Sequence, residues 1–294
     1  MNSPVYLNYD QTALDAQYNN RIAVPEHAEL YAGWAVDRQR ILMEHDHRLD
    51  EIYGDHAAQK LDIILPESAV ENEGENSTPY PVNIFIHGGF WMSRSKDDMT
   101  FIAEGLVRSG AAVVIIDYAL MPGVGMDEIV QQCREAVDWT YRNAASFGAD
   151  PNRIHVSGNS AGGHLVAMLM STDWSAFSGV PDDVIKSGCA MSGIYDLEPI
   201  RLTYMQPTLN LTEEDVLRNS PIHLMPSTQA PLIVSMGALE SDEFKRHAKS
   251  LKGVWENQCT VMELPGKNHF TINMALADAT CDLAKAVLNN MGLA

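Results

Sequence analysis

The sequence predicts an α/β fold with a mostly parallel central sheet flanked by helices, formed by one domain over residues 1–294. Short apolar runs typical of buried strands alternate with helical patterns of about ten residues or more, and connections of that length join parallel strands. The hydrophobic content of 46% supports a buried core. The expected strands cover residues 60–65, 82–86, 111–116, 154–156, 187–192, 232–236 and 259–264.

Helical patterns fill most of the intervals between these strands. They cover residues 95–110, 126–147, 161–170 and a stretch ending near 257, and a closing helix is expected from residue 271. Asp150, Pro151 and Asn152 are typical of a turn before the strand at 154. Residues 67–79 are rich in Glu, Asn, Ser and Gly, which indicates an exposed loop, and the proline-containing stretch 193–230 suggests a cap-like insertion over the carboxyl edge of the sheet.

Residues 1–58 are polar and aromatic, with helical spacing from Glu26 to His47 and no strand signal. We expect a helical segment that covers another part of the chain. Within it, the run Glu44-His45-Asp46-His47 contains residue types that bind metals. No third ligand group is evident, so we interpret this run as the polar face of a solvated helix and expect no metal site.

Charge and cysteine content limit the function classes and the compartment. The formal charge of −19 disfavours nucleic acid and anionic membranes as partners, because both would repel the chain. No run approaches the roughly 18 apolar residues of a membrane span, and Met1 to Asp10 has no secretory pattern. We expect a cytoplasmic protein with buried reduced thiols at Cys133, Cys189, Cys259 and Cys281; a homo-oligomer stays open.

The segment around Ser160 is the most informative part of the sequence. An apolar run ends in the pattern Gly-x-Ser-x-Gly, from Gly158 to Gly162, and a helical pattern begins immediately afterwards. This arrangement predicts a nucleophile elbow, a tight strand-to-helix turn that exposes the serine hydroxyl. The glycines leave room where a Cβ would collide, and the helix N-terminus favours developing negative charge. Ser160 is therefore the candidate nucleophile.

A second strand runs directly into His87, Gly88 and Gly89. Glycines at such a point let the backbone present N–H groups to a bound oxygen. We predict an oxyanion hole formed by the backbone N–H groups of Gly88, Gly89 and Phe90 together with that of Ala161, which follows the nucleophile. His87 is interpreted as a loop-shaping residue that bonds to backbone.

A serine nucleophile needs a base, and the base needs a carboxylate that fixes its tautomer. The predicted order along the chain is serine, acid, histidine. His269 lies in the loop after the last strand and is the candidate base, whereas Glu240 follows the strand at 232–236 and is the candidate acid. Asp242, two residues further, remains the alternative acid. Among the other histidines, we expect His155 and His164 to serve packing and His247 to face solvent on a charged helix, so none of the three is a candidate base.

With these motifs the chain resembles the kynurenine formamidase group of the α/β-hydrolase superfamily, close to the hormone-sensitive-lipase-like esterases. The resemblance runs from about residue 60 to the C-terminus and is carried by His-Gly-Gly-Phe-Trp at 87–91, Gly-Asn-Ser-Ala-Gly-Gly-His at 158–164 and Asn-His-Phe at 268–270. The family acid is usually an aspartate shortly before Glu-Phe, and Glu240 occupies that place ahead of Glu243 and Phe244. The lipase-like esterases carry a third glycine where Phe90 stands, which favours the formamidase branch.

The resemblance and the motifs together imply a serine hydrolase that cleaves aryl formamides, such as N-formylkynurenine, or short-chain acyl esters through an acyl-enzyme intermediate. Such chemistry requires no metal and no cofactor, and its partner is a small-molecule ester or amide. Phe90 and Trp91 are expected to crowd the acyl side of the substrate pocket. A general short-chain carboxylesterase is the alternative, and a non-catalytic ligand-binding protein of the same fold is a more remote one.

Overall fold

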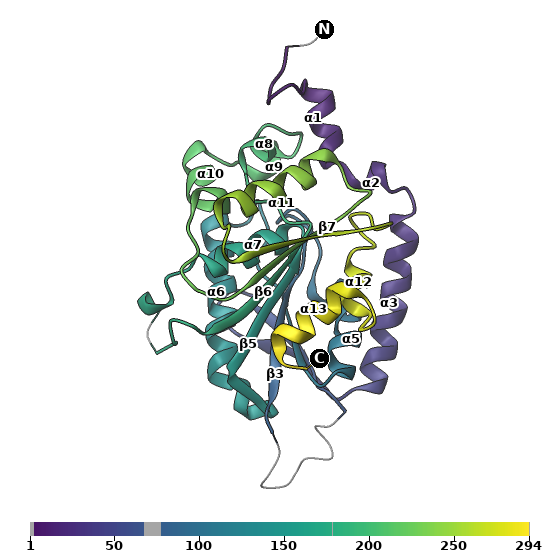
Figure 1. The fold of residues 1–294 in the computed structure, drawn as a ribbon, viewed down its shortest axis with the longest axis vertical. Helices are drawn as coiled ribbons and strands as arrows, with labels where there is room; N and C mark the ends of the chain where they lie inside the picture. Colours follow the sequence, from purple (N-terminus) through teal and green to yellow (C-terminus); the bar gives the residue numbers. More distant parts are fainter. Residues whose placement is uncertain (1–2, 68–77, 178, 294) are drawn as a thin grey trace.

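A computed structural model of the chain describes residues 3–67, 78–177 and 179–293. Its centre is an eight-stranded sheet with strand order β1-β2-β4-β3-β5-β6-β7-β8 (Figure 1). Neighbouring strands from β4 through β3 to β8 are parallel, whereas β2 pairs antiparallel with both β1 and β4. The strands are β1 (His47–Ile52), β2 (Lys60–Ile64), β3 (Tyr80–Ile86), β4 (Ala112–Ile116), β5 (Ala149–Asn159), β6 (Ile185–Met191), β7 (Leu232–Gly237) and β8 (Cys259–Leu264). The predicted mostly parallel α/β fold is confirmed.

Helices cover both faces of this sheet (Figure 1). They are α1 (Gln11–Tyr18), α2 (Asn20–Ala23), α3 (His27–Glu44), α5 (Ala103–Arg108), α6 (Met126–Asn143), α7 (Ala161–Met170), α8 (Glu198–Arg201), α9 (Gln206–Leu209), α10 (Glu213–Asn219), α11 (Asp242–Val254), α12 (Asn273–Ala277) and α13 (Asp282–Met291). Short 3-10 turns are η1 (Lys96–Ile102), η2 (Ala144–Phe147), η3 (Trp174–Ala176) and η4 (Pro221–His223).

The alternation of side chains along β4 divides the core into two layers. Val113 and Ile115 belong to the layer under α3, α5, α12 and α13. Ala112, Val114 and Ile116 belong to the layer that contains the buried faces of α6, α7 and α11. All five residues are fully buried, which explains why a parallel strand covered on both faces is a continuous apolar run.

The structure corrects the N-terminal prediction at one point. Residues 1–58 contain a strand, β1, although we expected only helix there. The segment His47–Ile52 is largely exposed and polar, and it pairs with β2 at the edge of the sheet. Because this edge strand has no buried apolar face, its sequence shows no alternating apolar pattern. Its formation depends on backbone pairing with β2.

Two further boundaries differ from expectation. The expected closing helix is divided into two helices, α12 and α13. In the turn between them, Thr280 N donates to Asp278 Oδ1 at 2.9 Å. The expected turn at 150–152 lies inside β5, where Asn152 N donates to Asp150 Oδ1 at 2.9 Å and the pairing with β3 shifts register. Most of the predicted 67–79 loop, residues 68–77, lies outside the described part of the chain.

The N-terminal helix α1 contacts the chain near α8 and α9, within the stretch 193–230. α8 and α9 lie in the upper part of Figure 1, near α1, and α10 lies on their far side. Gln11 Nε2 donates to Leu202 O at 2.9 Å, and Tyr204 N donates to Asp15 Oδ1, also at 2.9 Å. The N-terminal segment is therefore hydrogen-bonded to the part of the chain between β6 and β7.

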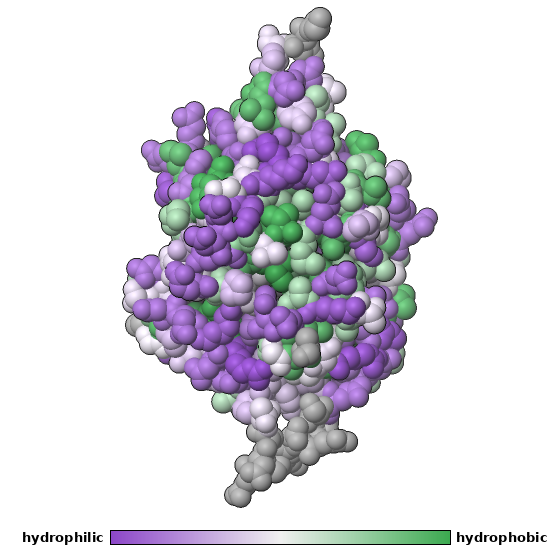
Figure 2. Space-filling view, viewed as in Figure 1, coloured by the Kyte–Doolittle hydropathy of each residue, from purple (hydrophilic) through white to green (hydrophobic). Residues whose placement is uncertain are grey.

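The surface agrees with the acidic composition. Figure 2 shows a mainly hydrophilic face with apolar patches near its centre. Among the described residues, no helix combines the length and hydropathy that crossing a bilayer would require. Cys133, Cys189 and Cys259 are buried free thiols as expected, whereas Cys281 is only half-buried because it caps α13 near the surface.

Two glycines bring the strand-to-helix turn close to neighbouring backbone. A Cβ on Gly158 would lie 2.5 Å from Gly162 O, and a Cβ on Gly162 would lie 1.9 Å from Ile86 O. Backbone atoms of a buried parallel strand cannot move aside as a flexible side chain can. β5, α7 and β3 can therefore approach this closely only if both positions are glycine.

We expect Gly162→Ala to lower the free energy of unfolding by about 3 kcal/mol or more, because its Cβ meets fixed backbone. The matched control is Gly253→Ala in α11, where nothing lies within 4 Å of the added Cβ. Helix propensity should make that control more stable by about 0.5–1 kcal/mol. Thermal unfolding of both purified variants measures the contrast, and equal melting temperatures would contradict the packing argument.

Candidate active site

Ser160 lies at the junction of β5 and α7 and has a strained backbone, with φ 58° and ψ −116°. Its N–H donates to Met191 O at 2.8 Å, which ties the turn to the end of β6. A non-glycine residue with this conformation costs free energy and persists only where surrounding contacts enforce it. The predicted strand-to-helix elbow is thus present, with the serine directly before the helix N-terminus.

His269 and Glu240 form a direct pair. His269 Nδ1 lies 2.5 Å from Glu240 Oε1. The other carboxylate oxygen, Oε2, accepts from Ser192 Oγ and from Gly237 N, both at 2.8 Å. Three donors therefore fix the orientation of one buried carboxylate, and the carboxylate in turn fixes the orientation of the imidazole.

The structure distinguishes between the two candidate acids. Asp242 is the first residue of α11 and is exposed, whereas Glu240 is 8% exposed and contacts His269. The Asp242 carboxylate lies in the N-terminal turn of α11, where its negative charge interacts favourably with the helix dipole. The longer side chain of Glu240, which follows β7 more closely, reaches the imidazole.

The loops that carry Glu240 and His269 are joined through their backbones. Leu239 N donates to Lys267 O at 3.0 Å, and Ala238 N donates to Leu264 O at 3.0 Å. A Cβ on Gly237 would lie 2.3 Å from Lys267 O, so the two loops approach closely only because residue 237 is glycine. Parallel pairing of β7 with β8 brings both loops to the same edge of the sheet.

Ser160 and His269 line the same cavity, which has a volume of about 530 Å³. Within the described chain, no hydrogen bond joins the Ser160 hydroxyl to the imidazole. Such contacts in ligand-free sites are commonly long and shorten when substrate binds. The cavity is large enough for a small aromatic substrate next to the serine.

The loop after β3 presents backbone N–H groups to this cavity. The N–H groups of Gly88, Gly89 and Phe90 donate to no other described protein atom, and all three residues line the cavity. Ala161 is the first residue of α7, where the N–H has no partner within the helix. Gly89 has φ 105° and a Cβ there would lie 2.1 Å from Ser93 O, so this loop requires glycine.

The structure corrects the position of one predicted pocket residue. Phe90 lines the cavity, but Trp91 does not, because it is fully buried beneath the loop. Trp91 Nε1 donates to His164 Nδ1 at 3.2 Å, and the two rings meet edge to face. Trp91 therefore anchors the loop to α7, and of the two aromatic residues only Phe90 lines the cavity.

The interpretations of three other histidines are confirmed. His87 Nδ1 bonds to Gly88 O at 2.8 Å and its ring stacks on Tyr118, so it shapes the loop. His155 and His164 are buried, and burial lowers the pKa of each imidazole to about 4. Both therefore stay neutral near pH 7 and pack inside the protein.

His247 is buried, and the expectation that it faces solvent is wrong. It lies on the inward face of α11, its Nδ1 accepts from Tyr195 N at 3.2 Å, and its Nε2 lies 2.9 Å from Tyr18 Oη. Tyr18 also donates to Glu243 Oε2 at 2.9 Å. The charged neighbours of His247 in sequence misled the prediction, because Tyr18 comes from α1 and covers this face of α11.

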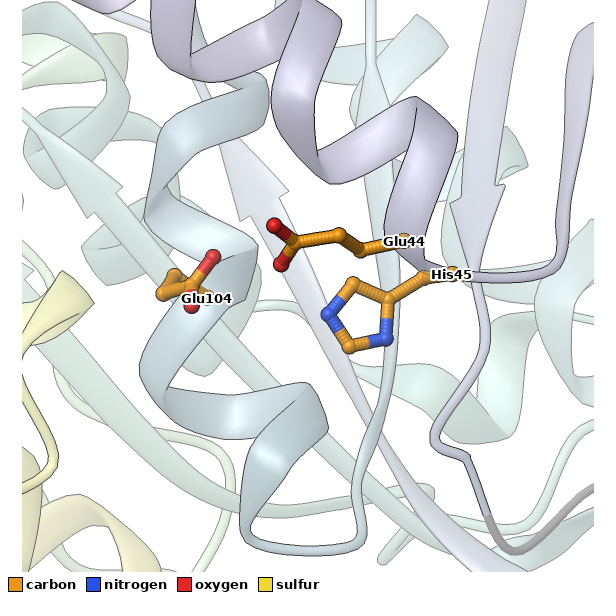
Figure 3. Close-up of side chains that lie close together, drawn as sticks. All are labelled: Glu44, His45 and Glu104. Atoms are coloured by element: carbon orange, nitrogen blue, oxygen red, sulfur yellow. The ribbon is translucent and has the colours of Figure 1, made fainter.

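A separate cluster of Glu44, His45 and Glu104 lies between α3 and α5 (Figure 3). α3 ends at Glu44 and His45 is buried, so the expected solvated helix face is wrong. Arg40 Nη1 contacts both carboxylates at 3.1 and 3.0 Å, and Arg108 binds both as well. A divalent cation here would lie beside two fixed positive charges, and the cluster therefore supports no metal proposal.

The N-terminal segment contributes a wall of the cavity that sequence reasoning did not identify. The lining residues from this segment are Tyr18, Asn19, Asn20, Arg21, Tyr31 and Trp34. Trp34 stacks on Phe101 with ring centres 4.4 Å apart, which fixes α3 against η1. The aromatic content of residues 1–58 was the available signal, but it did not show which surface the aromatic side chains would contact.

Similarity to known proteins extends over most of the chain. A kynurenine formamidase of Salmo salar is 34% identical over 249 residues, which cover 82% of this chain and 80% of the relative. A kynurenine formamidase of Danio rerio is 33% identical and covers 83% and 82%. The chain belongs to the kynurenine formamidase family. Over residues 61–182, it also matches the family model described as BD-FAE.

A solved structure supports the α/β-hydrolase fold. The crystal structure described as a putative thioesterase from Silicibacter sp. superposes with a TM-score of 0.79 at 29% identity. The superposition covers 92% of this chain and 97% of the other. This member of the kynurenine formamidase family is therefore a hydrolase with an α/β-hydrolase fold.

Proposed function

We propose that this hydrolase cleaves aryl formamides and short-chain acyl esters, with Ser160 as nucleophile, His269 as base and Glu240 as the acid of a catalytic triad. One observation carries the proposal: the hydrogen-bonded pair of His269 and Glu240 opens onto the same cavity as a serine on a strained strand-to-helix turn. Acyl transfer by a serine requires these three groups in these roles.

In the first half of the reaction, Ser160 Oγ attacks the carbonyl carbon and its proton passes to His269 Nε2. Glu240 accepts the Nδ1–H bond, so Nε2 is the free basic nitrogen and the resulting imidazolium is stabilised. The N–H groups of Gly88, Gly89 and Phe90, which have no partner among the described residues, donate to the oxyanion together with that of Ala161. Collapse of the tetrahedral intermediate breaks the bond to the leaving group, which takes the proton from His269.

Water completes the reaction at the acyl-enzyme. His269 removes a proton from the water, the hydroxide oxygen attacks the acyl carbon, and the bond to Ser160 Oγ breaks as that oxygen regains its proton. A formyl group leaves as formate and an acetyl group as acetate. Apart from the water molecule, the nucleophile, the base, the acid and the oxyanion donors of these steps all come from this chain.

The shape of the cavity supports a small acyl group and an aromatic leaving group. Phe90 borders the oxyanion loop and limits the space on the acyl side. The rest of the wall includes Tyr31, Trp34, Tyr204 and Phe270, whose rings can pack against an aryl group. The kynurenine formamidase relatives favour the formamide, whereas the same geometry would serve a general short-chain carboxylesterase.

The proposal is tested by comparing N-formylkynurenine with p-nitrophenyl acetate as substrates of the purified protein. We expect turnover of both, together with covalent labelling of Ser160 by a fluorophosphonate probe. Turnover of the ester alone would favour the carboxylesterase alternative. Absence of both turnover and labelling would contradict the serine mechanism and favour a ligand-binding role.

A further inference from the structure

The cavity at Ser160 has a local charge opposite to that of the chain. The sequence contains 39 acidic residues against 20 lysines and arginines, for a net charge of −19. The residues that line the cavity in the described chain nevertheless include Arg21 and Arg94 and no aspartate or glutamate. A cavity with low-dielectric walls and charge of one sign attracts ligands of the other sign.

Arg94 comes from the same loop as the oxyanion N–H groups and is held in a strained conformation, with φ 79°. Its guanidinium lies 3.5 Å from the centre of the Tyr31 ring, and its side chain is 21% exposed. The ion pair with Asp98 is long at 3.9 Å, and the same Asp98 oxygen accepts from Ser95 N at 3.1 Å. Stacking on Tyr31 therefore positions the guanidinium while the N–H donors on its edge remain available.

Arg21 lies near the same aromatic ring but comes from α2. Burial raises the pKa of the Tyr31 phenol, and the positive charges of Arg94 and Arg21 oppose part of that rise. The charge of Arg21 acts on Tyr204 in the same way. Within the described residues Arg21 has no ion pair, and the adjacent Asn20 has a buried Nδ2 that donates to no described atom. Donors from two separate segments thus meet at one wall of the cavity.

We propose that Arg21 and Arg94 form an anion subsite and that the enzyme selects substrates whose leaving group carries a carboxylate. This inference rests on the proposed function, in which Phe90 restricts the acyl side and leaves the arginine wall to the leaving group. An additional ammonium group on the substrate weakens binding, because none of the described residues that line the cavity carries a carboxylate to pair with it. The preferred substrate class is therefore a net anionic aryl ester or aryl formamide.

Three phenyl acetates with one scaffold test the subsite. They are the acetate ester of para-hydroxyphenylpropionic acid, its primary amide, and O-acetyltyrosine, which adds an ammonium group to the acid. Charge-assisted hydrogen bonds predict a kcat/KM about tenfold or more higher for the acid than for the amide, mainly through KM. O-acetyltyrosine should fall between them, and the preference should shrink at about 0.5 M salt.

Arg21→Gln and Arg94→Gln should each lower the ratio of acid to amide by about threefold or more, and the double variant should bring it near unity. The control is Lys249→Gln on the exposed face of α11, which changes the net charge by the same amount and should leave the ratio unchanged. A ratio near unity in the unaltered enzyme, or one that survives the double substitution, would overturn the subsite.

Failure of the subsite and failure of the proposed function give different results. If only the subsite is wrong, the amide ester is hydrolysed as fast as the acid, and the fluorophosphonate probe still labels Ser160. If the serine mechanism is wrong, none of the three esters is hydrolysed and no labelling occurs. Folding of each variant is checked by its melting temperature, which substitutions at the exposed Arg21 and the partly exposed Arg94 should change little.

Discussion

Ser160→Ala should lower kcat for ester hydrolysis by about 10⁴- to 10⁶-fold and abolish covalent labelling by a fluorophosphonate probe. In the proposed mechanism this hydroxyl is the atom that forms the acyl-enzyme, and it is the cavity hydroxyl that lies on the strained strand-to-helix turn. The variant should fold normally, since alanine removes one oxygen and the backbone turn is retained. Initial rates on p-nitrophenyl acetate and the melting temperature measure both expectations.

The matched control is Ser171→Ala at the opposite end of α7, where the hydroxyl donates only to Ala167 O at 3.0 Å. It should retain the rate of the unaltered enzyme within about twofold, because the lost hydrogen bond is far from the reacting atoms. A Ser160→Ala variant that keeps more than about a hundredth of the rate would remove this residue from the nucleophile role.

Glu240→Gln should lower kcat by about 10⁴-fold, since an amide cannot stabilise the imidazolium and can favour the wrong tautomer of His269. The carboxylate is held by Ser192 Oγ and Gly237 N as well as by the imidazole, so the amide would also lose favourable contacts with these donors. Rates at saturating ester, followed over a range of pH, measure the loss.

Asp242→Asn gives the direct comparison, because this carboxylate was the alternative acid from sequence. It is exposed at the start of α11, so its loss should cost at most about 1 kcal/mol of helix stabilisation and little activity. If Asp242→Asn rather than Glu240→Gln stops hydrolysis, the acid assignment proposed from the His269 contact is wrong.

The parts of the fold that sequence predicted well are those that depend on local signals. Buried parallel strands such as β4 are continuous apolar runs, so their position follows from composition alone. Glycines at 158 and 162 indicated the elbow, because the close approach of β3 to α7 leaves no space for a Cβ. Both signals lie within a few residues of the feature they predict.

The errors have a common physical cause, which is contact with another segment that the local sequence pattern does not reveal. β1 is polar and exists as a strand only through its pairing with β2. His247 has charged neighbours in sequence, yet Tyr18 from α1 covers it. Trp91 follows Phe90 directly in sequence, yet the loop turns it toward His164 and away from the pocket. For His247 and Trp91 the partner lies far away in the chain, and in none of the three cases does periodicity identify the partner.

The contribution of α1, α2 and α3 to the cavity has a consequence for how related enzymes can diverge. The hydroxyl, imidazole and carboxylate are held by the sheet, whereas Arg21 and Tyr31 belong to a segment that precedes every strand. Replacement of that leading segment would change which molecules are accepted while the bond-breaking apparatus stays intact. Exchanging the first 44 or so residues between relatives is therefore a direct route to new selectivity.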